Sequence, residues 1–262
     1  MAGGKNTMTA PFKNYFSAGS DAYRTFRPGY PPELFSWLAG LAPRREAALD
    51  CGCGTGQASV ALAEHFAKVY AADPSAAQIE NALPHPRVEY RVAPAEATGL
   101  PDRCVDLVIA AQALHWFDFD RFYPEVRRVA REGAVFAAFT YGLLTIDEEL
   151  DRVIGRFYRD TIGPCWPPER AHVDAGYRTI PFPFPEIEAP AFAMTAEWEP
   201  AHLLGYLETW SAVKEYRRIV GSDPLALVAD ELSAAWGDPT RVRRVSWPLV
   251  LRVGTIHPEH RP

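Results

Sequence analysis

Short apolar runs and segments of helical spacing alternate along the chain between residues 46 and 141. The apolar runs predict strands, and the segments in which apolar residues recur at helical spacing predict helices. Strands are expected at 47–50, 69–72, 88–92, 105–111 and 134–140, and helices at 57–67, 75–83 and 120–131. Strands that alternate with helices in this way indicate an α/β fold, a doubly wound parallel sheet with helices on both faces.

The regular alternation is confined to this central region. A helix is expected at 31–41, after the proline-rich stretch 23–32. Beyond Tyr141 the spacing of apolar residues predicts three helices and a closing strand, around 150–157, 203–210, 225–232 and 245–253. Many of the 24 prolines lie in this last part together with aromatic residues that need burial. We therefore expect a helical and proline-rich cap rather than a linker.

Composition narrows the classes of partner. The chain has 262 residues, 48% hydrophobic and 23% charged, which is typical of a globular protein. Its net charge of −6 disfavours nucleic acid, since duplex binding needs a positive face. The densest basic cluster, Arg241, Arg243 and Arg244, is interpreted as the solvated start of a strand. Without a long apolar run or a hydrophobic signal core, we expect a cytoplasmic protein that has no membrane partner.

Metal binding is not expected either. Cys51, Cys53, Cys104 and Cys165 do not form paired zinc knuckles, and the first two lie in a glycine loop that has another explanation. Another candidate set, His115, Asp118 and Asp120, has no further group converging on it.

The strongest motif is the loop ALDCGCGTGQAS at residues 48–59, in which Asp50, Gly52, Gly54 and Gly56 alternate with other residues. Glycines let the backbone turn sharply from strand to helix and approach a ligand closely. A dinucleotide loop would read G-x-G-x-x-G without a preceding acid, because a carboxylate there repels a pyrophosphate. An acid before the first glycine instead suits a ligand with an ammonium group and no phosphate, such as S-adenosylmethionine.

Three further segments complete a nucleoside site. Asp73 ends the second predicted strand, where a carboxylate can accept both ribose hydroxyls. After the third strand, Glu96 could accept from the exocyclic amine of adenine, and the Ala95 amide could donate to a ring nitrogen. After the fourth strand, Gln112, His115 and Trp116 should lie near the ligand. His115 is either a general base or a residue that shapes the acceptor site.

These motifs resemble those of class I S-adenosylmethionine-dependent methyltransferases, in the group of Type 11 methyltransferase domains. LDCGCGTG resembles their first motif, AADPS their second-strand acid, and AEATGLPDRCVDLVIAAQALHWFD the next two motifs. The resemblance implies a Rossmann-like seven-stranded sheet and S-adenosylmethionine as cofactor. It places cofactor contacts at Asp50, Gly52, Gly54, Gly56, Gln57, Asp73, Pro74, Ala95, Glu96 and Gln112. Pro94 departs from the pattern, since many relatives have Asp before the Ala-Glu pair.

The flanking segments YRTFRPGYP, GYRTIPFPFP, ETWSAV and ELSAAWGD resemble a narrower subgroup that is similar to trans-aconitate methyltransferases. This implies an enzyme that methylates a small molecule, with a carboxylic acid as the candidate acceptor and O-methylation as the reaction. His115 is the candidate catalytic base. Substrate contacts are expected from aromatic and arginine residues outside the core motifs: Tyr23, Arg27, Tyr30, Trp116, Tyr141, Arg178 and Trp210.

The implied organisation is an N-terminal segment with a lid helix (1–44), a cofactor-binding core (45–141) and a C-terminal substrate cap with closing strands of the same sheet (142–262). A monomer or a homodimer is expected. Two alternatives stay open. One is a non-catalytic or regulatory protein that binds S-adenosylmethionine, and the other is a nicotinamide-dependent oxidoreductase. A DNA or glutamine N-methyltransferase is disfavoured because AAQA stands where the Asn-Pro-Pro-aromatic motif of those enzymes would be.

Overall fold

The computed structural model of the chain describes residues 28–257. Its centre is a seven-stranded sheet in the order β3-β2-β1-β4-β5-β7-β6, which confirms the predicted α/β class. The first five strands in the chain pair in parallel, and β7 runs antiparallel to both of its neighbours. The strands are β1 (Ala47–Cys51), β2 (Lys68–Asp73), β3 (Val88–Val92), β4 (Val105–Ala111), β5 (Ala130–Tyr141), β6 (Phe192–Trp198) and β7 (Arg243–Thr255).

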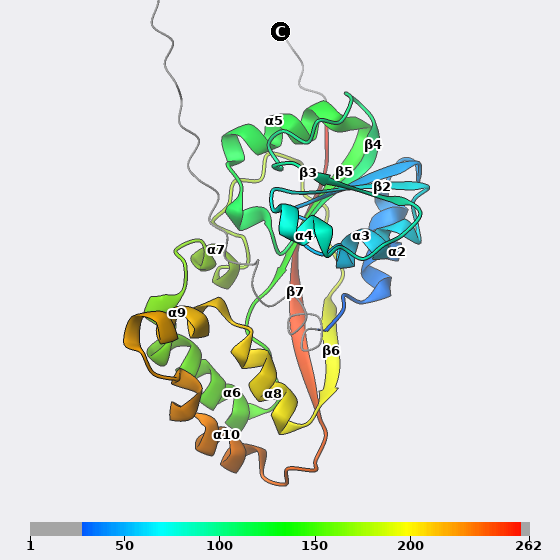
Figure 1. Ribbon diagram of the computed structural model, residues 1–262. Helices are drawn as coiled ribbons and strands as arrows, with labels where there is room; N and C mark the ends of the chain where they lie inside the picture. The colour runs from blue at the N-terminus through cyan, green and yellow to red at the C-terminus, as the bar shows by residue number, and fades with distance from the viewer. Residues whose placement is uncertain (1–27, 258–262) are drawn as a thin grey trace, which may run out of the picture.

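Helices cover both faces of the parallel strands (Figure 1). One apolar cluster joins α2 (Pro32–Leu41) and α3 (Gln57–Ala63) to one face of the sheet. A second cluster joins α5 (Phe119–Val129) and the 173–184 segment to the other face. Alternate residues of β1, β4 and β5 supply the two clusters, because successive side chains of a strand point to opposite faces.

Two helices end earlier than the apolar spacing predicts. The helix α3 ends at Ala63, and the short α4 (Ala76–Glu80) ends before the predicted limit at residue 83. Phe66 explains the first difference, since it is 1% exposed and packs into the core from the turn that follows α3. An apolar pattern therefore continues beyond a helix when a turn also contributes to the core.

The long strand β7 connects the sheet to the cap. Its last residues pair with β5, from Leu249↔Tyr141 to Thr255↔Val135. Its first residues pair with β6, from Arg243↔Trp198 to Leu249↔Phe192. The sequence predicted one closing strand at 245–253 but did not locate β6. In β6 only Met194 and Trp198 are buried, and the strand borders the sheet, so its apolar pattern is weak.

The cap is built from two chain segments. Between β5 and β6 lie α6 (Glu148–Arg156), a π-helical turn at Phe157–Thr161, a short turn at Gly163–Cys165 and α7 (Arg170–Asp174). Between β6 and β7 lie α8 (Pro200–Glu208), α9 (Ser211–Val220), a turn at Pro224–Leu227 and α10 (Ala229–Trp236). Because β5 leads directly into α6, the cap lies beyond the carboxyl ends of the parallel strands (Figure 1). Ligands of doubly wound sheets bind at this edge.

Two of the helices expected in the cap are present as α6 and α8. The helix expected at 225–232 is divided into the turn at Pro224–Leu227 and α10, which begins at Ala229, and α9 was not predicted. Trp210 follows α8 at the position just before α9, and the residue is 4% exposed. Its ring contacts Phe157, Tyr158, Trp166 and Tyr206, with centroids 5.6 to 6.3 Å apart. This aromatic cluster holds the two cap segments together, since large rings bury much apolar area.

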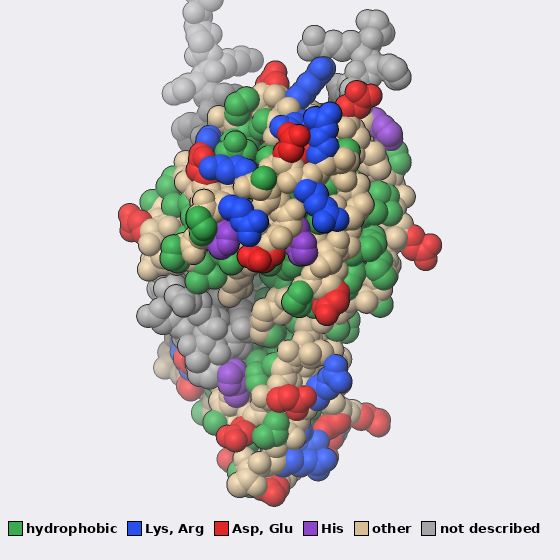
Figure 2. Space-filling view, turned by 90° about the vertical axis from the view of Figure 1, so that its right-hand side faces the viewer, with side chains coloured by type: hydrophobic (Ala, Val, Ile, Leu, Met, Phe, Trp, Pro, Cys, Tyr) green, Lys and Arg blue, Asp and Glu red, His purple; other side chains and the backbone are tan. Residues whose placement is uncertain are grey.

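The surface carries mixed charge. On the face drawn in Figure 2, lysine and arginine side chains alternate with acidic ones over both the core and the cap. A nucleic-acid groove would need a continuous basic stripe. In residues 28–257 every helix is too short or too polar to cross a bilayer.

Asp106 is a buried charge inside β4 and is fully inaccessible to solvent. Its Oδ2 accepts hydrogen bonds from the amides of Glu46 and Ala47, both at 3.1 Å, and pairs with Arg131 at 3.0 Å. The carboxylate thus joins the start of β1 to β4 and β5.

Replacement of Asp106 by Ala should lower the free energy of unfolding by about 2 kcal/mol, because it leaves the amides of Glu46 and Ala47 without their acceptor and leaves Arg131 with Glu46 as its remaining carboxylate partner. Urea denaturation measures this change. Glu188→Ala, at an exposed position, is the control. Equal stability of the two variants would contradict the role of Asp106.

Candidate functional site

The glycine loop follows β1 and is held against β2. The amides of Gly52 and Cys53 donate to the carbonyl oxygen of Ala72 at 2.8 and 3.1 Å. Gly52 and Gly56 have φ of 69° and 84°, a conformation that side chains disfavour. A Cβ atom at Gly52 would also lie 2.6 Å from Ala113. The close packing of this loop on the segment after β4 therefore requires glycine.

Tyr90 is a neighbour of the loop that the motifs did not reveal. A Cβ atom at Gly56 would lie 2.1 Å from the Tyr90 hydroxyl, which donates to the carbonyl of Leu83 at 2.6 Å. Tyr90 comes from β3, so its position depends on the order of the strands and not on a local pattern.

Asp50 lies at the base of the loop with no solvent exposure. Its Oδ2 accepts from the Ser59 hydroxyl at 2.6 Å. Its Oδ1 is buried and has no hydrogen-bond partner within residues 28–257. Burial raises the pKa of this carboxyl to about 7, and the nearby Asp73 adds to the rise. A ligand ammonium group fits this position, since it would provide the missing partner and stabilise the carboxylate.

Asp73 ends β2 and helps to shape the loop. Its two carboxylate oxygens accept from the amides of Gly54 and Ser75, each at 2.9 Å. Burial raises the pKa of Asp73 although both hydrogen bonds lower it. A carboxylate has about four acceptor positions, so Asp73 could still accept from two ligand hydroxyls. Pro74 follows it directly, and Gln57 begins α3 after Gly56.

The loop after β3 carries Ala95, which is buried, and Glu96, which is partly exposed. Glu96 Oε1 accepts from the amide of Asp118 at the start of α5, at 2.8 Å. This contact joins the loop after β3 to the segment after β4. The Glu96 carboxylate thus already has one protein donor beside the predicted adenine position.

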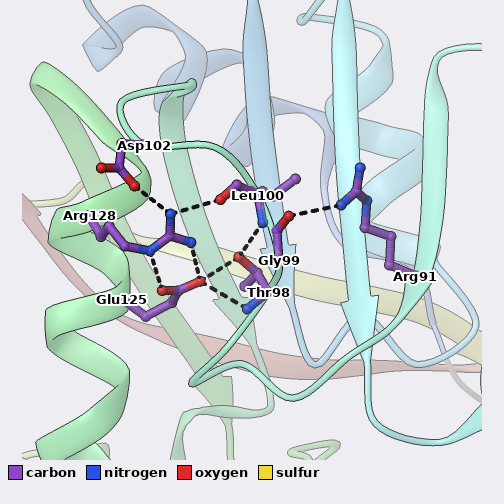
Figure 3. A network of polar contacts seen from close by, with 7 residues as sticks. All are labelled: Arg91, Thr98, Gly99, Leu100, Asp102, Glu125 and Arg128. Carbon is purple, nitrogen blue, oxygen red and sulfur yellow. Dashed lines mark hydrogen bonds and ion pairs between the residues drawn. The ribbon is translucent and has the colours of Figure 1, made fainter.

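The side chains of Glu125 and Arg128 in α5 bind the loop that follows β3 (Figure 3). Glu125 Oε1 accepts from the amide and the hydroxyl of Thr98, at 2.9 and 2.6 Å. Arg128 donates to the Leu100 carbonyl at 2.8 Å and pairs with Asp102 at 2.6 Å. Burial opposes ionisation, but hydrogen bonds from Arg128 and Thr98 hold the pKa of Glu125 below its ordinary value. The network fixes the backbone on which Ala95 and Glu96 stand.

The segment after β4 brings the predicted polar residues to the carboxyl edge. Gln112 has a φ of 53° and its side chain binds the backbone of Tyr141 at the end of β5. His115 Nδ1 lies 2.9 Å from the Tyr177 hydroxyl, and the His115 ring lies 4.8 Å from the Trp116 ring. Burial lowers the pKa of His115 to about 3, and the charges of Arg170 and His172 add to this effect. His115 is therefore a neutral imidazole.

An arginine of α7 in the cap, Arg170, is close enough to His115 for its charge to lower the pKa of His115, and it was not predicted. Its guanidinium stacks over the rings of Trp166 and Tyr158, 4.9 and 5.4 Å from the centroids. Its Nε donates to the Tyr158 hydroxyl at 2.7 Å and to Asp174 at 3.3 Å. Within the described part of the chain, its two terminal nitrogens form no hydrogen bond, and they could bind a carboxylate.

The other predicted substrate residues lie at separate positions in the core, in the cap and on the surface. Tyr30 packs against Phe35 and Phe139, with centroids 6.1 and 5.2 Å away. Tyr141 is buried at the end of β5, and Trp210 belongs to the aromatic cluster of the cap. Arg178 is exposed on the surface. Tyr23 and Arg27 lie outside the described residues.

The described residues offer no site for a metal ion. Across residues 28–257, no group of three or more His, Cys, Asp or Glu side chains could hold a metal ion. Cys51 and Cys53 are not disulfide-bonded, and burial raises the pKa of both thiols. The glycine loop and the carboxylates of Asp50 and Asp73 beneath it, together called the cradle, thus face a cap that carries aromatic and arginine side chains.

Comparison with known proteins agrees with this geometry. The methyltransferase domain family matches residues 49–138. A protein of Dictyostelium discoideum named as a methyltransferase is 35% identical over 239 residues, covering 87% of this chain and 91% of that protein. A solved structure from Anaeromyxobacter dehalogenans, described as a candidate type II methyltransferase, is 59% identical with a TM-score of 0.84 and covers 89% of this chain and 100% of that one.

A third relative has a named substrate. The malonyl-[acyl-carrier protein] O-methyltransferase of Herminiimonas arsenicoxydans is 31% identical over 156 residues, which is 57% of this chain and 58% of that protein. None of these relatives is a nicotinamide-dependent oxidoreductase, and the likeness to trans-aconitate methyltransferases stays a prediction. With its sheet order, its glycine loop and these matches, the chain belongs to the class I S-adenosylmethionine-dependent methyltransferases.

Proposed function

We propose that this S-adenosylmethionine-dependent methyltransferase transfers a methyl group to an oxygen atom of a small organic acid. The observation that carries the proposal is the position of Arg170. Its guanidinium is held over two aromatic rings beside His115, with its terminal nitrogens available in the described structure. The relative named as a malonyl-[acyl-carrier protein] O-methyltransferase supports transfer to oxygen.

We propose that the cofactor lies in the cradle of the glycine loop. Asp50 binds the ammonium group, because its buried Oδ1 needs a donor. Asp73 binds the ribose hydroxyls with its remaining lone pairs, and Gly52, Gly54 and Gly56 let the backbone approach. Ala95 and Glu96 contact the adenine. The remaining cofactor contacts come from the ends of the loops, at Gln57, Pro74 and Gln112.

The acceptor is proposed to lie between the segment after β4 and the cap. Arg170 holds its carboxylate, while Trp116, Tyr141 and Trp210 shape the space around it. We assign the arginine role to Arg170 rather than to Arg178, because Arg178 is exposed. Tyr23, Arg27 and Tyr30 remain candidates from the N-terminal side.

Catalysis depends mainly on how the protein positions the acceptor relative to the methyl group. The bound cofactor supplies a methyl group on a sulfonium, whose thioether is a good leaving group. The cradle and Arg170 place the acceptor oxygen in line with the carbon–sulfur bond, and such orientation can supply several kcal/mol of the rate enhancement. A carboxylate oxygen needs no base, whereas a hydroxyl oxygen would lose its proton to His115.

The affinity for S-adenosylhomocysteine should rise with pH, because its ammonium group binds the ionised form of Asp50. A carboxyl with a pKa of about 7 is mostly protonated at pH 6, so binding should be about eightfold weaker there than at pH 7.5. Asp50→Asn should bind weakly at both pH values. Calorimetric titration measures this, and a pH-independent affinity in the wild type would sink the assignment.

Arg170→Lys should raise the KM for an acid acceptor at least tenfold, because lysine keeps the charge but loses the planar fork. A screen of di- and tricarboxylic acids against their neutral amides, with radiolabelled S-adenosylmethionine, would identify the acceptor. Arg178→Lys is the matched variant and should leave KM within twofold. If Arg178→Lys raised the KM and Arg170→Lys did not, Arg178 would be the residue that binds the acid. Transfer to the amides alone would refute an acid acceptor.

A further inference from the structure

The packing of α7 brings an arginine of the cap to the segment that follows β4. Arg170 is the first residue of α7, and this helix lies against the turn at Leu114–Trp116. The ring of His172 in α7 meets the ring of Phe119 edge-on, with centroids 6.2 Å apart. The helix thus lies at the junction of core and cap, on the side where the acceptor is proposed to bind (Figure 1).

One edge of the Arg170 guanidinium is already bound by the protein. Its Nε donates to the hydroxyl oxygen of Tyr158 at 2.7 Å and to Oδ1 of Asp174 at 3.3 Å. The Tyr158 hydroxyl in turn donates to Oδ1 of Asp174 at 2.7 Å, because an ionised carboxylate can only accept. The direction of each bond in this triangle is therefore fixed, and Nε has no further hydrogen to donate.

Two aromatic rings set the plane of the guanidinium. Its central carbon lies 4.9 Å from the centroid of the Trp166 ring and 5.4 Å from that of the Tyr158 ring. The Trp166 indole nitrogen donates to the carbonyl oxygen of Tyr158 at 3.4 Å, and its ring lies 5.6 Å from that of Trp210. Because these rings are themselves held in place, stacking on them restricts the rotation of the Arg170 side chain.

The position of Tyr158 depends on a π-helical turn. This turn, Phe157–Thr161, continues α6, and the amide of Ile162 donates to the carbonyl oxygen of Phe157 at 3.1 Å, five residues back. In an α-helix the same amide would bind the carbonyl of Tyr158, which here accepts from the Trp166 indole. Such turns are rare and frequently occur at functional sites. The irregular turn thus lets one residue bind both the arginine and a ring that stacks on it.

We infer that Tyr158 and Asp174 are positioning residues that occupy Nε of Arg170, so that the carboxylate of the acceptor binds end-on, across Nη1 and Nη2. A guanidinium offers a carboxylate two edges, the side edge with Nε and the end edge with the two terminal nitrogens. The side edge is occupied, and the terminal nitrogens form no hydrogen bond within residues 28–257. The inference rests on the proposed function and refines it, because it states which atoms of Arg170 bind the acid.

End-on binding gives the acceptor a defined direction. Two parallel N–H···O bonds place its carboxylate in the plane of the guanidinium, on the extension of the Nε–Cζ bond. Because the protein fixes that plane before the acid arrives, the long arginine side chain loses little freedom on binding. Loss of the Tyr158 hydroxyl should therefore weaken the binding of the acid and leave the transfer step itself intact.

Exchange of the Nε hydrogen tests the positioning without any acceptor. In the full chain labelled with ¹⁵N-arginine, the Nε–H signal of Arg170, assigned by its absence in Arg170→Lys, should exchange slowly with water. Tyr158→Phe keeps the ring and removes the hydroxyl, so it should speed this exchange about fivefold. Tyr123→Phe is the matched control, because Tyr123 is also buried and its hydroxyl donates to the Pro181 carbonyl. An unchanged rate in Tyr158→Phe, or an equal change in Tyr123→Phe, would overturn the inference.

Steady-state kinetics test the consequence for the acceptor. With succinate, citrate and tricarballylate as acceptors and labelled S-adenosylmethionine, Tyr158→Phe should raise the KM of the acid about fivefold. The kcat should stay within about twofold, since the hydroxyl holds a binding group and touches no reacting atom. Asp174→Ala should act in the same way, and Asp174→Asn should restore most of the loss, because its amide oxygen still accepts from Tyr158. The affinity for S-adenosylhomocysteine should be unchanged in all three variants.

The same variants separate this inference from the proposed function. If Arg170→Lys raises the KM while Tyr158→Phe and Asp174→Ala leave it unchanged, the positioning role is refuted and the acid-binding role of Arg170 stands. A fall in kcat at constant KM in Tyr158→Phe would also refute the positioning role. If all variants leave the KM unchanged, or none of the acids is methylated, the acid-binding role is refuted together with end-on binding, and the exchange measurement still decides whether Tyr158 holds Nε.

Discussion

The pairing of β7 with both β5 and β6 is the interaction on which the arrangement of this molecule depends. One strand of 13 residues completes the sheet with its last part and carries the cap with its first part. Because backbone hydrogen bonds fix the register, the cap helices on either side of β6 are held beyond the carboxyl ends of β1, β2 and β4. The cofactor cradle and the acceptor side of the site therefore belong to one continuous hydrogen-bonded framework.

The charges of the site are divided between its two sides. Asp50 and Asp73 are buried beneath the glycine loop, where they can accept hydrogen bonds from an ammonium or a hydroxyl group of a ligand. Arg170 lies on the other side, in the cap. Burial raises the pKa of both carboxyls, so the folded protein holds them at an energetic cost that a bound cation would relieve. From this division we propose that the ammonium group of the cofactor lies on one side and an anionic acceptor on the other.

Much of the polar structure around the site supports the loops that carry it. Glu125 and Arg128 fasten the loop after β3, Glu96 joins that loop to α5, and Gln112 joins β4 to β5. Each contact gives a backbone amide or carbonyl a side-chain partner, and for the buried amide of Thr98 the loss of that partner would be costly. The loops at the carboxyl edge are thereby fixed in place before any ligand is bound.

The sequence by itself determined the parallel core, the glycine loop and the acids Asp50 and Asp73. These features depend on apolar periodicity and on short spacings within single strand–loop–helix units, which a linear pattern records. Only the tertiary structure decided the positions of β6, Tyr90, Arg170 and Tyr177. Strand order places β6 at the edge of the sheet and Tyr90 beside the glycine loop, whereas packing of the segment between β5 and β6 brings Arg170 and Tyr177 toward His115. The sequence pointed to Arg178, which is exposed, whereas the packing of α7 places Arg170 over the rings of Tyr158 and Trp166, where its charge acts on His115.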